Sequence, residues 1–205
     1  SFTQTGGLFT CSSGAGGTNI TTINFTGTGK TFTQSGGTFT LTRINFTIAS
    51  GASLTLASNF ALNTAGKSLT VNGTLNCSTF ALTGAGDFTL ASSNTATLGI
   101  GSTAGISSTA STGNIQVIGT RAYGASANYK YNGSANQASG NQLPLSVYGL
   151  EIANTGAGGS NTVTLGQACT VTGTLTLTSG LLATTTTNNV TVSNTATAGV
   201  SGGSS

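Results

Sequence analysis

The sequence is nearly devoid of the side chains on which most enzyme chemistry depends. Its 205 residues include five Lys or Arg, two acidic residues and one Pro, and there is no His, Met or Trp. Charged residues therefore occur about once in 30 positions, against about a quarter of all positions in a typical soluble domain. A Ser nucleophile has no His to activate it, and the only carboxylates, Asp87 and Glu151, are far apart in the chain. We expect a protein that is not an enzyme, with no catalytic residues, no metal site and no cofactor.

Long apolar runs and clusters of like charge are also missing. No apolar stretch approaches the roughly 20 residues that a membrane-spanning helix needs, so we expect no transmembrane segment. The net charge of +3 comes from dispersed cations, and a dispersed charge does not predict nucleic-acid binding. Disorder normally combines low hydrophobicity with high net charge. A chain of this length and low charge is instead expected to fold around a core.

Cysteine is scarce and odd in number. Cys11, Cys77 and Cys169 are widely separated and have no metal-ligand spacing. One hypothesis is a disulfide together with one unpaired thiol. The other is that the cysteines serve as small apolar core residues, which is favoured for Cys77 and Cys169 because both lie in strand-like runs.

Small or short polar residues make up most of the sequence. Thr, Gly, Ser and Asn together account for 117 of the 205 positions. Apolar residues alternate with Thr or Asn, as over 38–48, and this period of two is typical of strands with one buried face. The same alternation predicts strands over 54–56, 69–75, 88–90, 163–165, 171–177 and 190–192. Gly-containing segments between them permit tight turns.

Internal repeats indicate how such strands are arranged. SFTQTGGLFT at 1–10 recurs as TFTQSGGTFT at 31–40, INFT at 23–26 recurs at 44–47, and TVNGTL at 70–75 recurs as TVTGTL at 170–175. Repeats of one strand-turn-strand unit predict an all-β fold, a parallel β-helix or β-solenoid of about eight to ten turns. A tandem β-sandwich is the alternative, because it also uses short alternating strands.

Aromatic residues divide the chain. All nine Phe lie between Phe2 and Phe88, and all four Tyr lie between Tyr123 and Tyr148. We therefore expect a Phe-containing solenoid over 1–120, a longer excursion or seam over 121–148, and a solenoid continuation over 149–205 with a flexible Ser/Gly end. Within the Tyr-containing stretch, one hypothesis is a surface for sugars, and the other is that the Tyr side chains fill the seam. The candidate contact residues are Tyr123, Tyr129, Tyr131, Asn132 and Gln137.

Several segments resemble a known group of proteins. The runs GNIQVIGTRAYGASANYKYNGSANQASGNQLP and VYGLEIANTGAGGSNTVTLGQACTVTGTLTLTSGLL, within about 69–192, resemble repeat regions of very large secreted surface adhesins and fibre proteins of Bacteroidota, which the type IX pathway exports. The resemblance implies an extracellular or cell-surface location and a structural or adhesive role. It implies no catalytic residues.

The ends of the chain bear on assembly. A strand-like repeat begins at Phe2 and no amphipathic cap closes the C-terminal run, whereas the terminal turns of a solenoid normally need capping. We expect a mature form, a fragment or one unit of a longer chain. Its partners would then be further copies, or further turns of the same chain, in a fibre. The alternative is a surface module that binds glycans or cells through the Tyr-containing stretch.

Overall fold

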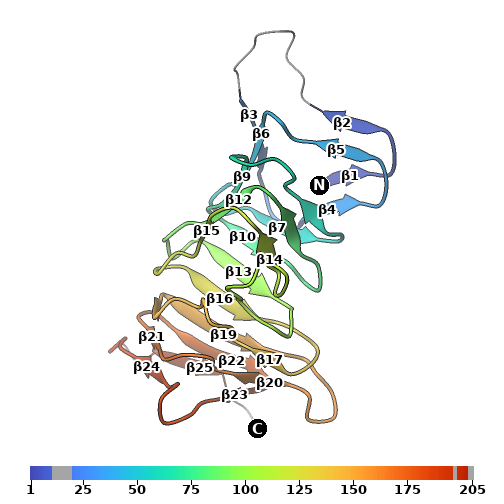
Figure 1. Ribbon diagram of the computed structural model, residues 1–205. Coiled ribbons are helices and arrows are strands. Elements are labelled where there is room, and N and C mark those ends of the chain that lie inside the picture. Colours follow the sequence, from blue (N-terminus) through green and yellow to red (C-terminus); the bar gives the residue numbers. More distant parts are fainter. Residues whose placement is uncertain (11–19, 196–197, 203–205) are drawn as a thin grey trace.

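The chain folds into a β-solenoid of about eight turns. Figure 1 shows a computed structural model, which describes residues 1–10, 20–195 and 198–202, with the N-terminal turns at the top and the C-terminal turns at the bottom. Those residues form strands and turns and no helix, so they include no helix able to cross a membrane. Every strand pairing is parallel. The predicted all-β solenoid is therefore confirmed, and the tandem β-sandwich is not formed.

Each turn contributes up to three strands, and the first strands of all turns form one continuous sheet. This nine-stranded sheet consists of β1 (Phe2–Gln4), β4 (Lys30–Gln34), β7 (Ser53–Leu56), β10 (Thr74–Asn76), β13 (Thr97–Ile100), β16 (Asn128–Tyr131), β19 (Gly149–Ala153), β22 (Leu175–Ser179) and β25 (Val200–Gly202).

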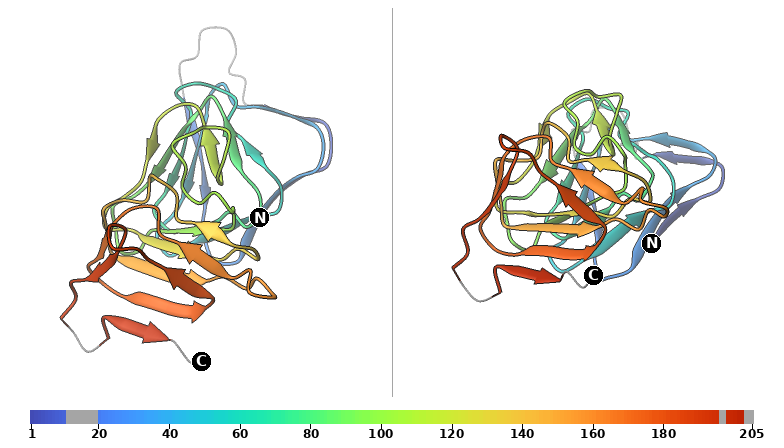
Figure 2. Two further views of the ribbon diagram at one scale, coloured as in Figure 1. Left: turned by 60° about the horizontal axis from the view of Figure 1, so that its bottom comes forward. Right: turned by 90° about the horizontal axis from the view of Figure 1, so that it is seen from below.

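The second and third strands of the turns form shorter sheets. The second strands are β2 (Leu8–Thr10) with β5 (Thr38–Thr40); β8 (Phe60–Ala61), β11 (Leu82–Gly84) and β14 (Ile115–Val117); and β17 (Gln137–Ala138), β20 (Thr162–Thr164) and β23 (Leu181–Ala183). The third strands are β3 (Thr21–Phe25), β6 (Ile44–Ile48), β9 (Ser68–Val71), β12 (Asp87–Leu90) and β15 (Arg121–Ala122), then β18 (Ser146–Val147), β21 (Cys169–Val171) and β24 (Val190–Val192). Figure 2 shows the turns stacked around a common interior.

The Tyr-containing stretch 121–148 is built into this stack. It contains β15 to β18, and β16 lies within the nine-stranded sheet. The shorter sheets are interrupted here, because the sheet of third strands that begins at β3 ends at β15 and a new one begins at β18. Only the nine-stranded sheet runs through the stretch without a break.

The core consists of apolar rows that run along the stack. Because successive strands pair in register, Leu54, Leu75, Leu98, Tyr129 and Leu150 lie over one another, and each is buried. The N-terminal turns fill the same interior with Phe. The Phe60 ring stacks on Phe32 at a centroid distance of 4.1 Å and meets Phe46 edge to face at 4.9 Å.

The repeated segments 1–10 and 31–40 stack on each other residue for residue. Phe2 pairs with Phe32 and Gln4 with Gln34 in β1 and β4, and Phe9 pairs with Phe39 in β2 and β5. The Phe2 and Phe32 rings are stacked at 5.2 Å, and Gln34 Nε2 donates to Gln4 Oε1 at 3.2 Å. Identical side chains thus stabilise each other across adjacent turns.

At the corners, glycine allows the backbone of one turn to lie very close to the backbone of the next turn. Gly73 joins β9 to β10, and a Cβ atom there would lie 2.3 Å from the Ala49 carbonyl oxygen and 2.4 Å from that of Ala52. The Ala52 oxygen already accepts the amide of Thr74. A side chain at this corner would therefore push adjacent turns apart.

We predict that Gly73→Ala lowers the free energy of unfolding by about 1–3 kcal/mol, as overpacking does in other proteins. Gly6→Ala is the matched control, because no described atom lies within 4 Å of a Cβ at Gly6. Urea denaturation followed by circular dichroism measures both. Equal stability of the two variants would contradict the close approach at this corner.

Candidate functional site

Tyr129 and Tyr131, two of the candidate contact residues, are fully buried. The Tyr129 hydroxyl donates to the Gly124 carbonyl at 2.9 Å, and the Tyr131 hydroxyl donates to the Ser139 carbonyl at 2.7 Å. Burial raises the pKa of both hydroxyls well above its ordinary value. The rings fill the interior of the solenoid, so neither presents a face on which a sugar could stack.

Tyr123 is also part of the packing. Its ring lies 5.7 Å from that of Phe88, and its buried hydroxyl has no hydrogen-bond partner among the described residues. Burial is the main cause that raises the pKa of this hydroxyl. Tyr123 and Tyr131 therefore differ in whether the buried hydroxyl is satisfied.

Gln137 belongs to an internal amide network. Its Nε2 donates to the carbonyls of Ile100 and Ser102, and its Oε1 accepts from the Gly133 amide and from Asn154 Nδ2. All four polar contacts are internal, so Gln137 holds neighbouring turns together and is not available to a ligand.

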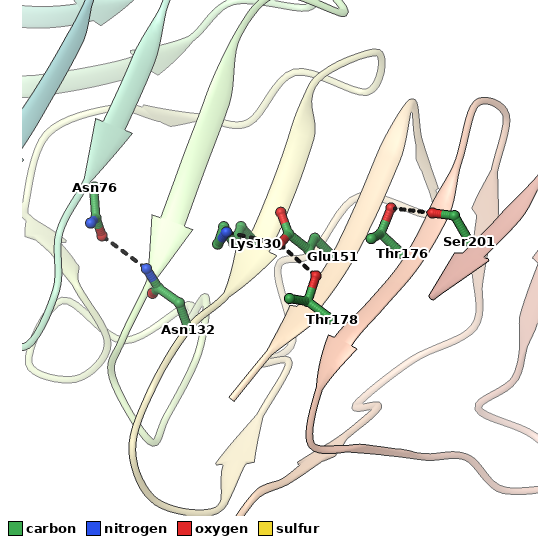
Figure 3. Close-up of polar contacts among 7 residues, drawn as sticks. All are labelled: Asn76, Lys130, Asn132, Glu151, Thr176, Thr178 and Ser201. Carbon is green, nitrogen blue, oxygen red and sulfur yellow. Dashed lines mark hydrogen bonds and ion pairs between the residues drawn. The ribbon is translucent and has the colours of Figure 1, made fainter. Parts of the chain in front are cut away.

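Asn132 lies beside the nine-stranded sheet and reaches across a turn. Its Nδ2 donates to Asn76 Oδ1 at 3.1 Å, as Figure 3 shows, while its own Oδ1 is buried without a partner among the described residues. The Asn132 amide nitrogen is thus hydrogen-bonded within the protein.

The two described cysteines, Cys77 and Cys169, are buried free thiols, in line with the core hypothesis. Burial raises the pKa of the Cys77 thiol to about 12 and that of the Cys169 thiol to about 11. Cys11 lies outside the described residues. Residues 1–10, 20–195 and 198–202 contain no group of His, Cys, Asp and Glu that could hold a metal ion.

The two carboxylates are placed on different sheets. Asp87 lies in β12, where its Oδ1 accepts the amide of Thr120 at 2.6 Å. Glu151 lies in β19 of the nine-stranded sheet and does not face Asp87. The structure therefore does not bring the carboxylates together.

The outer face of the nine-stranded sheet is a nearly uncharged polar surface. In register across neighbouring strands, one row contains Thr55, Asn76, Gly99, Lys130, Glu151, Thr176 and Ser201. Figure 3 shows the charged pair, in which Lys130 Nζ lies 2.8 Å from Glu151 Oε1. Thr178 donates to the same oxygen at 2.9 Å, and Ser201 Oγ donates to Thr176 Oγ1 at 3.1 Å.

A depression of about 270 Å³ surrounds this ion pair. It is lined by Thr97, Asn128, Tyr129, Lys130, Tyr148, Gly149, Leu150, Glu151, Thr174 and Thr176. The candidate contact residues predicted from the sequence do not include Lys130, Glu151 or Tyr148. A signal was present, since aligning NYKY at 128–131 with GLEI at 149–152 pairs Lys130 with Glu151.

Comparison of the chain with family models, with curated proteins and with solved structures finds no match.

We predict that Tyr131→Phe and Tyr123→Phe have different effects on stability. Tyr131→Phe removes one of the two donors to the Ser139 carbonyl, which keeps the Ile106 amide, and is expected to cost about 0.5–1.5 kcal/mol. Tyr123→Phe removes a buried hydroxyl that has no described partner, so stability is expected to be unchanged or to rise. Urea denaturation of both variants tests this, and an equal loss would contradict the difference in hydrogen bonding.

We also predict that stability falls as the pH rises from 9 towards 11. An unfolded chain releases its thiol protons near pH 9.0, whereas Cys77 and Cys169 in the folded chain keep theirs until about 12 and 11. The folded state therefore binds more protons over this range, and stability decreases with pH. Urea midpoints measured across this range check the sign. Cys77→Ala should show a shallower decrease, and a midpoint independent of pH would refute the expectation.

Proposed function

We propose that the protein is a non-enzymatic structural segment of an extracellular fibre or adhesin, in which the end strands pair with further turns of the same kind. Such turns come from a second copy or from an adjoining part of the same polypeptide. A stack of parallel strands is stiff along its axis, because every turn is hydrogen-bonded to its neighbours. The proposed role is to provide length and rigidity.

One observation carries this proposal, namely the pairing of β1 with β4. A FTQ strand accepts a second FTQ strand in register, with Phe on Phe and Gln on Gln. The contact between segments 1–10 and 31–40 is therefore an example, within this chain, of one turn stacking on another of nearly identical sequence. Copies added end to end would place β25 (Val200–Gly202) of one copy on β1 of the next, which extends the same parallel pairing with different side chains at the junction.

The last described turn presents an apolar row at its end. Val200 continues the row of Leu150 and Leu175 and is 54% exposed, whereas those two Leu residues are buried. Covering this end with another turn would bury Val200 and pair the free edge of β25.

The surface composition is consistent with a crowded extracellular setting. The outer face of the nine-stranded sheet consists mostly of Thr, Asn, Gly and Ser, which permits fibres to pack side by side without charge repulsion. The resemblance of 69–192 to secreted Bacteroidota repeats supports the same location. A glycan-binding module built on Tyr123, Tyr129 and Tyr131 is not favoured, because Tyr129 and Tyr131 have no exposed surface and Tyr123 packs against the core.

The proposal predicts that Val200→Lys weakens end-to-end stacking, because an added turn would bury the new charge. Ser201→Lys is the matched control, since Ser201 lies on the outer face of the same strand. Sedimentation velocity at increasing concentration, with electron microscopy, should show end-to-end particles for the wild type and Ser201→Lys and shorter ones for Val200→Lys.

A second experiment tests the case in which the further turns belong to the same polypeptide. Two copies joined in tandem should form one straight rod with a single unfolding transition, and Val200→Lys in the first copy should introduce a hinge. Single particles at every concentration, together with a tandem chain that behaves as two independent bodies, would overturn the proposal.

A further inference from the structure

The depression on the nine-stranded sheet arises where glycine interrupts the rows of outer side chains. Gly149 lies beside Asn128 in the pairing of β16 with β19, and Gly99 lies beside Lys130 in the pairing of β13 with β16. Gly149 lines the recess and adds no side chain to it, whereas Gly99 lies outside the lining, beneath the Asn76 amide. Its lining comes from β13, β16 and β19, the residue before β19, and the segment at the start of β22.

Asn128 is held in a defined orientation at the edge of this recess. Its Nδ2 donates to the carbonyls of Asn94 and Ala96 at 2.8 and 3.2 Å. A Cβ atom on Gly149 would lie 2.3 Å from Asn128 Oδ1, so the amide oxygen lies over Gly149. No described residue donates to this oxygen, which leaves it as an oriented acceptor.

The ion pair supplies further hydrogen-bonding capacity without net charge. Lys130 uses one ammonium donor on Glu151 Oε1 and so retains two of its three. Glu151 Oε1 also accepts from Thr178, whereas no described residue donates to Oε2. The two side chains are 37% and 30% exposed, so their remaining donors and acceptor can reach a bound molecule.

Tyr148 provides an aromatic face at the border. It is 39% exposed, unlike Tyr129 and Tyr131. Two of its ring carbons would lie 2.9 Å from a Cβ on Gly173, so the ring lies against this glycine. The Tyr ring combines an apolar face with a polar edge, as is common at surfaces that contact partly polar ligands.

We propose that this depression binds one sugar ring of a neutral glycan. An exposed aromatic face, an oriented amide oxygen, ammonium donors, a carboxylate acceptor and Thr hydroxyls are all present within one recess. A pyranose has apolar C–H faces, which pack on an aromatic ring, and adjacent hydroxyls that both donate and accept. The recess is slightly smaller than the roughly 300 Å³ that begins the range of drug-sized pockets, which suits a single ring.

The lack of net charge at the ion pair favours a neutral ligand over an anionic one. Binding of a phosphate or a polyanion needs an excess of cations, and here Glu151 neutralises Lys130. A purely apolar ligand would leave the exposed donors and acceptors unpaired, at a cost in free energy. The proposal does not depend on end-to-end stacking, because neither end strand, β1 or β25, lines the recess.

The test is saturation-transfer NMR and calorimetry of the full chain with neutral oligosaccharides at millimolar concentration, namely cellotetraose, xylotetraose, mannotetraose and chitotetraose. At least one should bind, and Tyr148→Ala should weaken that binding at least about tenfold, as loss of an aromatic anchor does elsewhere. Gly149→Ser should also weaken it, because the new side chain would displace the Asn128 amide. The affinity should be insensitive to salt, since neither the site nor the ligand carries net charge.

Leu145→Ala is the control, because Leu145 is an exposed apolar residue near Tyr148 that does not line the recess. Circular dichroism confirms that each variant is folded. Polygalacturonate and a mixed-sequence oligonucleotide serve as anionic probes. The proposal is overturned if no neutral oligosaccharide binds, if only an anionic probe binds, or if Tyr148→Ala binds as well as Leu145→Ala.

Discussion

Parallel backbone pairing between successive turns is the constraint on which the rest of this structure depends. It places every residue over its equivalent in the next turn, at a spacing of about 4.8 Å. Inward rows are therefore mostly apolar, as Leu54, Leu75, Leu98 and Tyr129 are, although Lys30 precedes Leu54 in this row and is half-buried. Outward rows must tolerate their own repetition, which favours Thr, Ser and Asn over charged residues, because stacked like charges repel. The scarcity of charge thus follows from the architecture.

Variable turn length is accommodated outside the strands. Lys130 and Glu151 are paired across a turn of 21 residues, whereas the pairing of Thr97 with Asn128 spans 31. The nine-stranded sheet remains continuous, and the shorter sheets are interrupted near β15 and β18. Where they are interrupted, the Gln137 and Asn154 amides satisfy backbone groups of neighbouring turns. A fully satisfied internal amide network is compatible with burial.

The proposed functions use different parts of the same stack. Length comes from the ends, where β1 and β25 each have one neighbour in the sheet and further turns would pair with them. Recognition comes from the side, where Gly149 interrupts the polar face of the sheet and an ion pair borders the recess that it lines. A rigid sheet is a suitable scaffold for such a site, because the strands hold the side chains in place.

The sequence by itself predicted most of the strands, a repeating stack and much of the core. Alternation predicted one strand over 69–75 and one over 171–177, whereas the structure divides each into two strands at a corner that contains Gly73 or Gly173. Period-two alternation located β6, β7 and β9, and the repeat of 1–10 at 31–40 anticipated the register of Phe2 on Phe32. Alternation shows that Tyr129 and Tyr131 share a face, but only the tertiary structure decided that this face is internal. The register likewise decided that Lys130 meets Glu151 beside Tyr148. Turn length sets which residues of adjacent turns coincide, and that length varies along the chain because corner segments absorb insertions without disturbing the backbone pairing.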